Sequence, residues 1–546
     1  MLCWALPPDV DGRRLLRSGT KHRRASAQVA EDMQNRLAEV FAGLFRCEPG
    51  AQAHRQLLVE ALAACYVAMD AGQQFPHESA SRLLAALEAA VAGDPEEFPL
   101  EYQWQAGEIK IALAALLADS KLAKRLAREG QKATARGMLE LIDGRGIPHA
   151  DDLPLLRPLL ASWTRCLAIA DRTGSPWPAG MQSRYRKAVR GVLHLTRPDG
   201  GAVFGGGRAD EDRALLATAL HLSGEDMDQR VARTALRGIS VASSRNGAVL
   251  PELPKPAVES EAAATAVLRA AWSRRAPRIV VTYPGRHCDI ELCVDEKVLL
   301  SGRWGFEVAR DGKPLATEGD WEQTCWVSDK EVDYLELQIA LSGGARLQRH
   351  VMLSRADDTA LLADAVLTSP SDPSLLSLAP AAGLQYRGTW QLACNERSTV
   401  RFQPQADSRE GYLVAGVRRA LVMPLALPEW REDRRVGELE AGATEVSLRH
   451  EAAGENLFAP LWLDLNPRHL RAQRTWRQLS VGEGLQAVPL SVAAGFRIAV
   501  DKKQWILYRA LSRRGNRTLL GHNLSSEMLV ARFDRRGEVH SLIEIE

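Results

Sequence analysis

A glycine-rich stretch flanked by charged residues is the first place where this sequence could do chemistry. Residues 196–207 read TRPDGGAVFGGG, and Arg197, Asp199 and Arg208 stand within this stretch or directly after it. Glycines allow a backbone to approach a ligand closely, and such loops commonly carry function. The three charged residues are therefore candidates for binding a substrate, and the alternative is an ordinary turn with solvated arginines.

The flanking sequence decides between a phosphate-binding loop and a connection between helices. A phosphate loop follows a strand and carries a GxGxxG or GxxxxGK[ST] pattern, and neither pattern occurs in residues 196–207. The preceding RYRKAVRGVLHL has helical spacing, and the PDG triplet is a standard turn signal. We therefore predict a helix-to-helix loop.

Three residues of the neighbouring helical segments are candidates for catalysis. Tyr185 could act as an acid or a base, but it shares the apolar face of its helix with two valines, so a place in the core is the alternative. His194 lies nine residues later and faces away from that apolar stripe. Arg165 lies off the stripe that contains Trp163, and its alternative is a surface cation.

An aromatic ring and a carboxylate one helical turn apart form a candidate sugar-binding pair. Trp104 and Glu108 open and close the string WQAGE, where the ring could stack on a sugar and the carboxylate could bind its hydroxyl groups. A helix cap and a core anchor are the alternative for this pair.

Two charged clusters stand in the second half of the chain. TCWVSDKEVDYLEL gathers four carboxylates whose density suggests a calcium loop, but their spacing matches no EF-hand and a solvated hairpin is the alternative. PRHLRAQRTWR is the best local anion patch, or else a sheet edge guarded by charge. The carboxylates are Asp329, Glu331, Asp333 and Glu336; the arginines are Arg468, Arg471, Arg474 and Arg477, with Trp476 among them.

Composition excludes several classes of protein. The 70 basic and 68 acidic residues leave a net charge of +2, which is too balanced for a general nucleic-acid or membrane partner. The chain has no apolar run long enough to span a membrane and does not begin like a secretory signal, so we expect a cytoplasmic protein, or a periplasmic or secreted one if the true start lies upstream. The eight cysteines form no CxxC pair and the histidines no HxxxH or HExxH, so we expect reduced thiols, no metal site and no cofactor.

The hydrophobic period changes along the chain and predicts two kinds of structure. Residues 26–250 repeat apolar positions with helical spacing, separated by short Gly/Pro/Asp connections, which indicates helical hairpins after a flexible basic tail at 1–25. Residues 251–275 contain PELPKPAVES and are predicted to be a linker. Residues 276–546 alternate with a period of two, as in YLELQIAL, which predicts a large antiparallel β-sandwich. The predicted fold class is multidomain, α then β.

The strings WQAGE, SWTRC and RPDGG within helical hairpins, followed by a β-sandwich, resemble the heparinase II/III-like polysaccharide lyases. The resemblance spans residues 30–546 in architecture and implies an incomplete α/α toroid followed by an antiparallel sandwich. It also implies an anionic polysaccharide or oligosaccharide as partner. The lyases of this family cleave uronate-containing chains by β-elimination. A cationic or amide group neutralises the uronate carboxylate, a Tyr or His removes the C5 proton, and an acid protonates the departing oxygen.

The Asn-Asn-His stretch and the histidine-rich metal-holding segment of that family are absent from this sequence, so no catalytic residue is carried over by motif. Two alternatives to a lyase therefore stay open. One is a non-catalytic relative that binds glycans or proteins. The other is a toroid glycoside hydrolase, which needs two carboxylates about 5 to 9.5 Å apart.

Overall fold

The computed structural model of the chain describes residues 26–546 with gaps. The gaps are residues 71, 73–76, 90–93, 118–119, 176, 178, 206–208, 240–251, 369–382, 396–397, 432–436 and 535–536. The chain divides into two compact units, residues 1–253 and 254–546, which we call the helical unit and the β unit. The prediction that helices come first and antiparallel sheets follow is confirmed.

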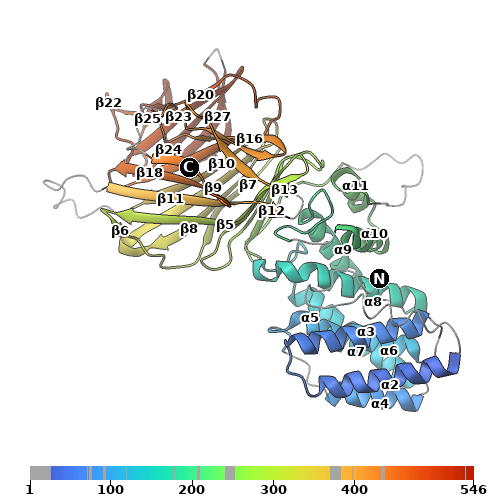
Figure 1. Cartoon of the computed structure of the whole chain (residues 1–546). Coiled ribbons are helices and arrows are strands. Elements are labelled where there is room, and N and C mark those ends of the chain that lie inside the picture. The colour runs from blue at the N-terminus through green and yellow to red at the C-terminus, as the bar shows by residue number, and fades with distance from the viewer. Residues whose placement is uncertain are drawn as a thin grey trace. The chain divides into compact units, whose positions relative to one another are not determined.

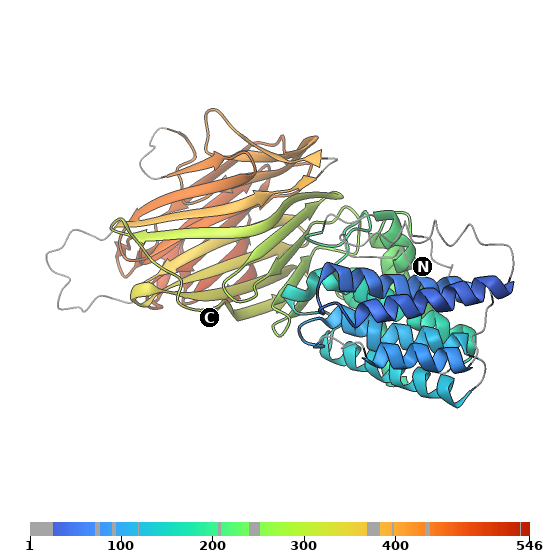
Figure 2. The same ribbon diagram turned by 60° about the horizontal axis from the view of Figure 1, so that its bottom comes forward.

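The helical unit is a succession of helices that pack against their neighbours along the chain (Figures 1 and 2). Its elements are α2 (Ser26–Leu44), α3 (Gln52–Asp70), α4 (His77–Ala89), α5 (Pro99–Tyr102), the π-helix η2 (Gln103–Glu108), α6 (Ile109–Leu116), α7 (Lys121–Glu140), the 3₁₀-helix η3 (Ala150–Leu155), α8 (Leu156–Thr173), α9 (Ala179–His194), α10 (Ala209–Ser223) and α11 (Asp226–Ala235). α2 contacts α3, α6 contacts α7, and α9 contacts α10, while α8 contacts both α6 and α10. None of the helices in the described ranges is both long and apolar enough to span a bilayer.

A helix cap divides an apolar stripe that looks continuous in the sequence into two helices. The apolar spacing in GEIKIALAALLADSKLAKRL runs through Leu117, but α6 ends at Leu116. The hydroxyl oxygen of Ser120 accepts a hydrogen bond from the Ala123 amide at 3.1 Å and caps α7. Such a cap satisfies one of the amides that have no partner in a first turn, so a new helix begins there.

Five antiparallel sheets form the described part of the β unit. The nine-stranded sheet contains β1 (Val258–Ser260), β2 (Thr265–Arg269), β3 (Arg278–Thr282), β4 (Asp289–Val294), β5 (Lys297–Arg310), β11 (Gly383–Leu392), β18 (Glu445–Ala453) and β17 (Gly437–Ala441) in this order, with β6 (Lys313–Pro314) paired to β5. The eight-stranded sheet has the order β14 (Arg401–Pro404), β15 (Gly411–Ala415), β16 (Val417–Pro424), β19 (Leu457–Asp464), β10 (Thr359–Leu367), β9 (Ala345–Ser354), β8 (Val332–Leu341) and β7 (Glu322–Ser328).

The remaining sheets are smaller. The five-stranded sheet has the order β20 (Arg474–Leu479), β23 (Ala493–Val500), β24 (Lys503–Ala510), β27 (Met528–Phe533) and β28 (Val539–Ile545). A four-stranded sheet has the order β22 (Gln486–Ala487), β21 (Gly482–Glu483), β25 (Arg517–Leu519) and β26 (His522–Leu524), and β12 (Cys394–Asn395) pairs with β13 (Ser398–Thr399).

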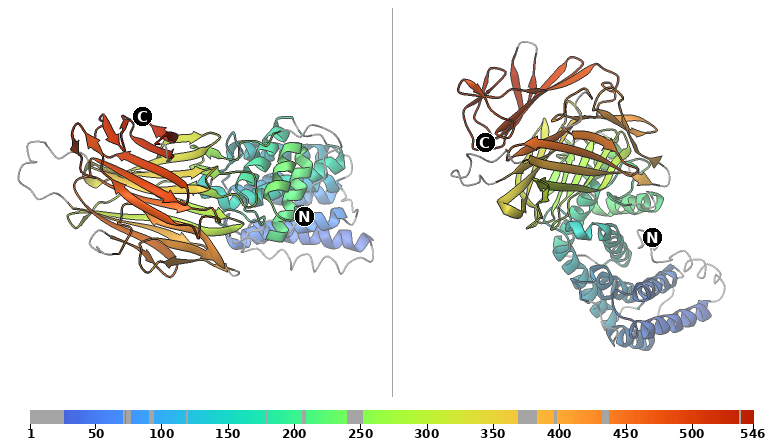
Figure 3. Two further views of the ribbon diagram at one scale, coloured as in Figure 1. Left: turned by 90° about the horizontal axis from the view of Figure 1, so that it is seen from above. Right: turned by 60° about the vertical axis from the view of Figure 1, so that its left-hand side comes forward.

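Strand β10 shows how the three larger sheets are layered. Every one of its residues is buried, so both faces of the eight-stranded sheet are covered at its centre. On one face Leu361 belongs to the same apolar cluster as Phe496 and Leu507 of the five-stranded sheet. On the other face Asp364 accepts a hydrogen bond from the Tyr386 hydroxyl of the nine-stranded sheet at 2.7 Å. The eight-stranded sheet therefore lies between the other two, a layering visible in Figure 3.

A buried ion pair ties two of these layers together. Arg349 donates to both carboxylate oxygens of Asp364 at 2.9 and 2.8 Å, and neither side chain is exposed. The guanidinium also donates to the Trp304 carbonyl at 2.9 Å and lies 4.0 Å from the centre of the Trp304 ring. A buried charge is tolerated only when it is paired and hydrogen-bonded in this way, and the bond to the Trp304 carbonyl links the eight-stranded sheet to β5 of the nine-stranded sheet.

Candidate functional site

The WQAGE stretch forms most of a π-helix that joins α5 to α6. Short π-helical turns are rare and occur often at functional sites. Helix α7 approaches η2 closely because glycines face it: a Cβ on Gly130 would lie 2.8 Å from the Gly107 carbonyl oxygen, and one on Gly137 would lie 2.3 Å from the Gln103 amide. This close approach places Gln103 and Glu108 inside the helical unit.

Glu108 and Arg165 meet there in a sealed ion pair. Arg165 Nε lies 2.5 Å from Glu108 Oε1, and Nη2 lies 3.0 Å from Oε2. The Tyr66 hydroxyl of α3 donates to Glu108 Oε1 at 2.9 Å. Burial acts to lower the pKa of Arg165, but the Glu108 carboxylate outweighs it and the net pKa is raised, so the guanidinium stays charged. With side-chain exposures of 1% for Arg165 and 0% for Glu108, the surface-cation alternative for Arg165 is wrong.

The neighbouring aromatic residues are also interior. Trp104 is 1% exposed and belongs to the core of the helical unit. Gln103 accepts a hydrogen bond from Trp163 Nε1 at 3.0 Å and donates to the Ala133 carbonyl at 3.1 Å. Trp104 thus presents no open face for a sugar ring in this conformation, because a stacked ring needs an accessible indole.

Tyr185 is fully buried and pairs with a hydroxyl of the preceding helix, α8. Its hydroxyl oxygen lies 2.9 Å from Thr164 Oγ1, which donates to the Leu160 carbonyl at 2.6 Å. Burial raises the pKa of Tyr185, and the hydrogen bond with Thr164 offsets only part of this rise. The phenol is therefore neutral at ordinary pH and held by a structural contact.

His194 and the glycine-rich stretch lie at the end of α9. The stretch connects α9 to α10, so the prediction of a helix-to-helix loop is confirmed. His194 is the last residue of α9 and is 6% exposed. Arg197 Nη1 donates to the Gly205 carbonyl at 2.6 Å, and the exposed Asp199 accepts from the Gly201 amide at 3.0 Å. Both side chains thus shape the loop, whereas Arg208 lies outside the described residues.

A buried arginine of α8 holds this loop through hydrogen bonds. Arg157 of α8 donates to Thr196 Oγ1 at 2.7 Å and to the Gly200 carbonyl at 3.2 Å. It also lies 3.9 Å from a carboxylate oxygen of Asp212 in α10. Sequence reasoning missed Arg157, Tyr66 and Gln103, because their partners are far along the chain. The one local signal was Tyr66, a hydroxyl within the apolar run ALAACYVAM.

The predicted carboxylate cluster of the β unit is divided among separate structural contacts. Asp333 is buried and bonds Ser328 Oγ at 2.7 Å and Arg355, while Glu336 accepts from the Tyr334 hydroxyl at 2.7 Å. Glu331 pairs with an arginine of β27 at 2.9 Å. Within the described ranges, His, Cys, Asp and Glu side chains do not gather in threes that could hold a metal ion. The calcium-loop interpretation of this stretch is therefore wrong.

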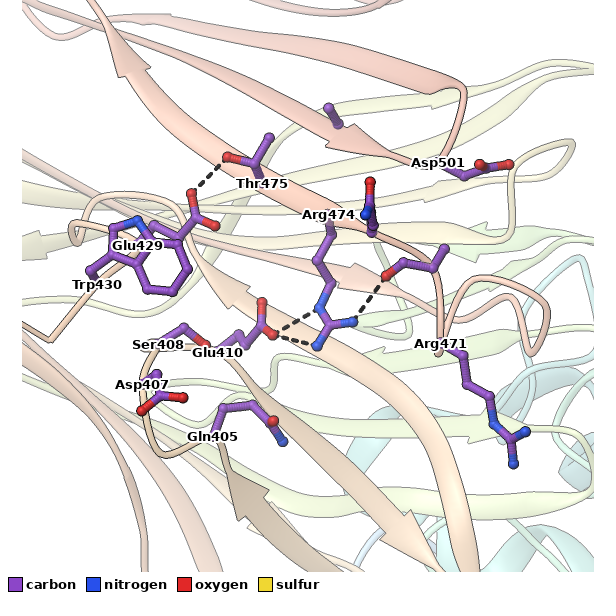
Figure 4. Close-up of a pocket in the computed structure, with 13 residues that line it drawn as sticks. Gln405, Asp407, Ser408, Glu410, Glu429, Trp430, Arg471, Arg474, Thr475 and Asp501 are labelled. Atoms are coloured by element: carbon purple, nitrogen blue, oxygen red, sulfur yellow. Dashed lines mark hydrogen bonds and ion pairs between the residues drawn. The ribbon is translucent and has the colours of Figure 1, made fainter.

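The predicted anion patch of the β unit is also rearranged. Trp476 is 1% exposed and donates to the Leu427 carbonyl at 3.0 Å, so it is a core residue. Arg474 pairs with Glu410 at 2.5 Å, which neutralises its charge locally. Arg474 and Arg471 line a cavity of the β unit that also contains carboxylates (Figure 4). The arginines of this stretch therefore do not form a uniformly positive surface.

No family model and no curated protein matches the sequence. Solved structures do match it. A mutant of the heparan sulfate lyase HepC from Pedobacter heparinus is 10% identical with a TM-score of 0.57, and the match covers 87% of this chain and 74% of that one. HepC itself gives 11% identity and a TM-score of 0.55 over 85% of this chain and 71% of that one. A heparinase III gives 11% identity and a TM-score of 0.55 over 92% and 76%. The chain therefore has a distant heparinase-like fold, helical first and β-rich second.

Proposed function

We propose that this chain is a carbohydrate-active protein of the polysaccharide-lyase type, acting on an anionic, uronate-containing glycan. The observation that carries the proposal is the fold: the match to a heparan sulfate lyase extends through 87% of the chain and so includes both units. The helical unit is taken as an incomplete α/α toroid and the β unit as its sandwich. Because a fold alone does not determine chemistry, the residues of this chain decide how the proposal is tested.

The proposed reaction is β-elimination and needs no oxidant or cofactor. A base removes the proton at C5 of the uronate, the electron pair forms a C4=C5 double bond, and the C4–O bond breaks. The departing oxygen takes up a proton. A cation at the uronate carboxylate stabilises the negative charge that develops as the C5 proton leaves.

We assign the base to His194 and the cation to Arg197, because both lie at the end of α9 and the loop that follows it; His194 is 6% exposed, so the proposal requires this loop to move aside for the glycan. The Arg197 guanidinium donates to the Gly205 carbonyl, and its planar set of N–H donors has the geometry that binds a carboxylate in a bidentate manner. The proposed task of Asp199 is to hold the turn. Arg208, which lies outside the described residues, stays a prediction as a further contact to the glycan.

The buried candidates receive positioning roles in this proposal. Tyr185, Arg165 and Glu108 are covered and already hydrogen-bonded, so a glycan reaches them only if the helices separate. We propose that they fix the helices on which the loop stands, together with Trp104. This burial is also the observation that favours a second function, a relative that binds anionic glycans without cleaving them.

Incubation with heparan sulfate, chondroitin sulfate and alginate tests the proposal, with ultraviolet absorbance of the unsaturated product as the readout. We expect product that persists in the presence of a chelator, and loss of at least about 100-fold in rate for His194→Gln. His221→Gln is the matched control, because it makes the same substitution at an exposed histidine of α10, and it should keep the wild-type rate. Tyr185→Phe inactive with His194→Gln active would overturn the assignment of the base.

The same incubation separates the alternatives. New reducing ends without ultraviolet absorbance would indicate hydrolysis instead of elimination. Binding of these polymers without any cleavage would establish the second function. Absence of both cleavage and binding for all three polymers would contradict the proposed function.

A further inference from the structure

A cavity of about 620 Å³ opens in the β unit, where the eight-stranded and five-stranded sheets approach each other (Figure 4). Three chain segments that are far apart in sequence form its walls. These are residues 405–410 between β14 and β15, residues 429–430 after β16, and residues 471–475 leading into β20; Ala499 and Asp501 complete the lining. The cavity lies wholly within the β unit.

The backbone around the cavity is held by a short ladder. The Arg409 amide donates to the Glu429 carbonyl at 2.9 Å, and the Arg431 amide donates to the Asp407 carbonyl at 3.3 Å. The guanidinium of Arg409 is fully buried and donates to the carbonyls of Pro428, at 3.2 Å, and of Trp430. The loop that carries Trp430 is therefore fixed before any ligand arrives, which lowers the entropic cost of binding.

Trp430 stands apart from the other tryptophans of the β unit. Its side chain is 53% exposed, whereas five other tryptophans of this unit are less than 2% exposed: Trp304, Trp390, Trp462, Trp476 and Trp505. An exposed indole beside a cavity provides a flat apolar face with a polar rim. The face of a sugar ring that carries C–H groups matches such a surface in size and polarity.

The polar groups of the cavity are both donors and acceptors. Glu410 is paired with Arg474 through contacts of 2.8 and 2.5 Å, and Glu429 accepts from Thr475 Oγ1 at 2.6 Å. Asp407 and Asp501 are exposed at the rim and add two negative charges. Further donors come from Ser408, Gln405, Gln473 and Arg471.

This balance of charge selects the ligand class. Four carboxylates face two arginines, so a uronate or a sulfate would meet net negative charge and be repelled. The ammonium groups of a lysine-rich peptide would use the carboxylates, but they only donate hydrogen bonds and so offer no acceptor to the side-chain donors. The hydroxyl groups of an uncharged sugar donate and accept at once, and so match both sets of groups.

We propose that this cavity binds an uncharged pyranose unit, stacked on Trp430 and hydrogen-bonded by Arg474, Glu429 and the rim carboxylates. The site is separate from the proposed anionic-glycan site of the helical unit and does not depend on lyase activity. It gives the protein a second point of attachment on a carbohydrate, one that recognises a ring instead of a charge.

Calorimetric titration of the full chain with neutral tetramers of β-linked glucose, N-acetylglucosamine, galactose and mannose tests the proposal. We expect at least one of them to bind, and Trp430→Ala to weaken that binding by about tenfold or more. Trp430→Phe should restore part of the affinity because it returns an aromatic face. Leu485→Ala, at a fully exposed apolar residue, is the control and should change nothing.

Other outcomes of this titration would overturn the proposal or assign the cavity to a different ligand. Failure of all four neutral tetramers to bind, or binding that Trp430→Ala leaves unchanged, would overturn the proposal. A lysine tetrapeptide or a heparan sulfate tetrasaccharide that binds and loses affinity in Trp430→Ala would assign the cavity to a charged ligand instead. Formation of unsaturated product from uronate polymers should not change in Trp430→Ala, so failure here is distinguishable from failure of the proposed lyase function.

Discussion

Each unit of the molecule contains a Glu–Arg pair among the residues of its candidate site, and the two pairs differ in their access to water. In the helical unit, Glu108 and Arg165 are 0% and 1% exposed and are joined by Tyr66. In the β unit, Glu410 and Arg474 are 7% and 17% exposed and line a cavity. A Glu–Arg pair therefore acts as an internal brace in the helical unit, whereas the Glu–Arg pair of the β unit forms part of the polar wall of a cavity.

Neutralising the carboxylate of each pair tests whether the two pairs differ in their contribution to stability. Glu108→Gln leaves the buried Arg165 charge uncompensated and should lower the free energy of unfolding by about 3 to 5 kcal/mol. Glu410→Gln should cost only about 1 to 2 kcal/mol, because Arg474 can turn toward water. Denaturant unfolding followed by helical circular dichroism and by tryptophan fluorescence would measure both variants.

A double variant sharpens the interpretation. Arg165→Met in the Glu108→Gln background removes the stranded charge, so it should recover part of the lost stability. Equal losses for Glu108→Gln and Glu410→Gln would contradict the distinction between brace and wall.

The second comparison uses pH, because the β unit contains a histidine that burial keeps neutral. Burial lowers the pKa of His450, on β18, from 6.5 to about 4. The unfolded chain therefore binds a proton at this residue at a higher pH than the folded chain does. The contribution of His450 to the free energy of unfolding is fully present above about pH 6.5 and is lost as the pH drops toward 4. The loss reaches about 3 kcal/mol, at 1.36 kcal/mol per pKa unit.

The free energy of unfolding across this pH range, measured for His450→Gln, should fall less steeply than for the wild type. His540→Gln is the control, because the His540 side chain is 63% exposed. The same slope in His450→Gln and the wild type would show that this residue does not cause the acid sensitivity.

Local chemistry explains which parts of the fold the sequence predicts. The change of hydrophobic period predicts helices before sheets, and the PDG turn predicts the loop after α9, because both signals lie within a few adjacent residues. Ser120 is a typical N-cap residue, but the apolar stripe that continues through Leu117 obscures the boundary between α6 and α7 in the sequence. The third layer of the β unit was not predicted, although the nearly continuous apolar run of β10, TALLADAVL, is typical of a strand buried on both faces.

The candidate sites were harder to predict because their partners are distant in sequence. Arg165 and Glu108 are 57 positions apart, and the helical spacing that placed Arg165 off its apolar stripe cannot report a charge that enters from another helix. The cavity beside Trp430 combines segments that lie between Gln405 and Asp501, and its contact between Glu410 and Arg474 joins residues 64 positions apart. The string PRHLRAQRTWR predicts a cluster of arginines, but it cannot predict the carboxylates from distant segments that change the charge of their surroundings.

The most direct test of the account is the affinity of Arg197→Ala for a heparan sulfate oligosaccharide, measured by calorimetric titration beside Asp199→Ala. Arg197 is assigned to the glycan carboxylate, so its loss should weaken binding by about 1.5 to 3 kcal/mol. Asp199 holds the turn through the Gly201 amide, so its loss should lower the melting temperature and largely spare affinity. A wild type that does not bind, or an Arg197→Ala variant that binds as tightly as the wild type, would contradict the claim that the loop after α9 recognises an anionic glycan.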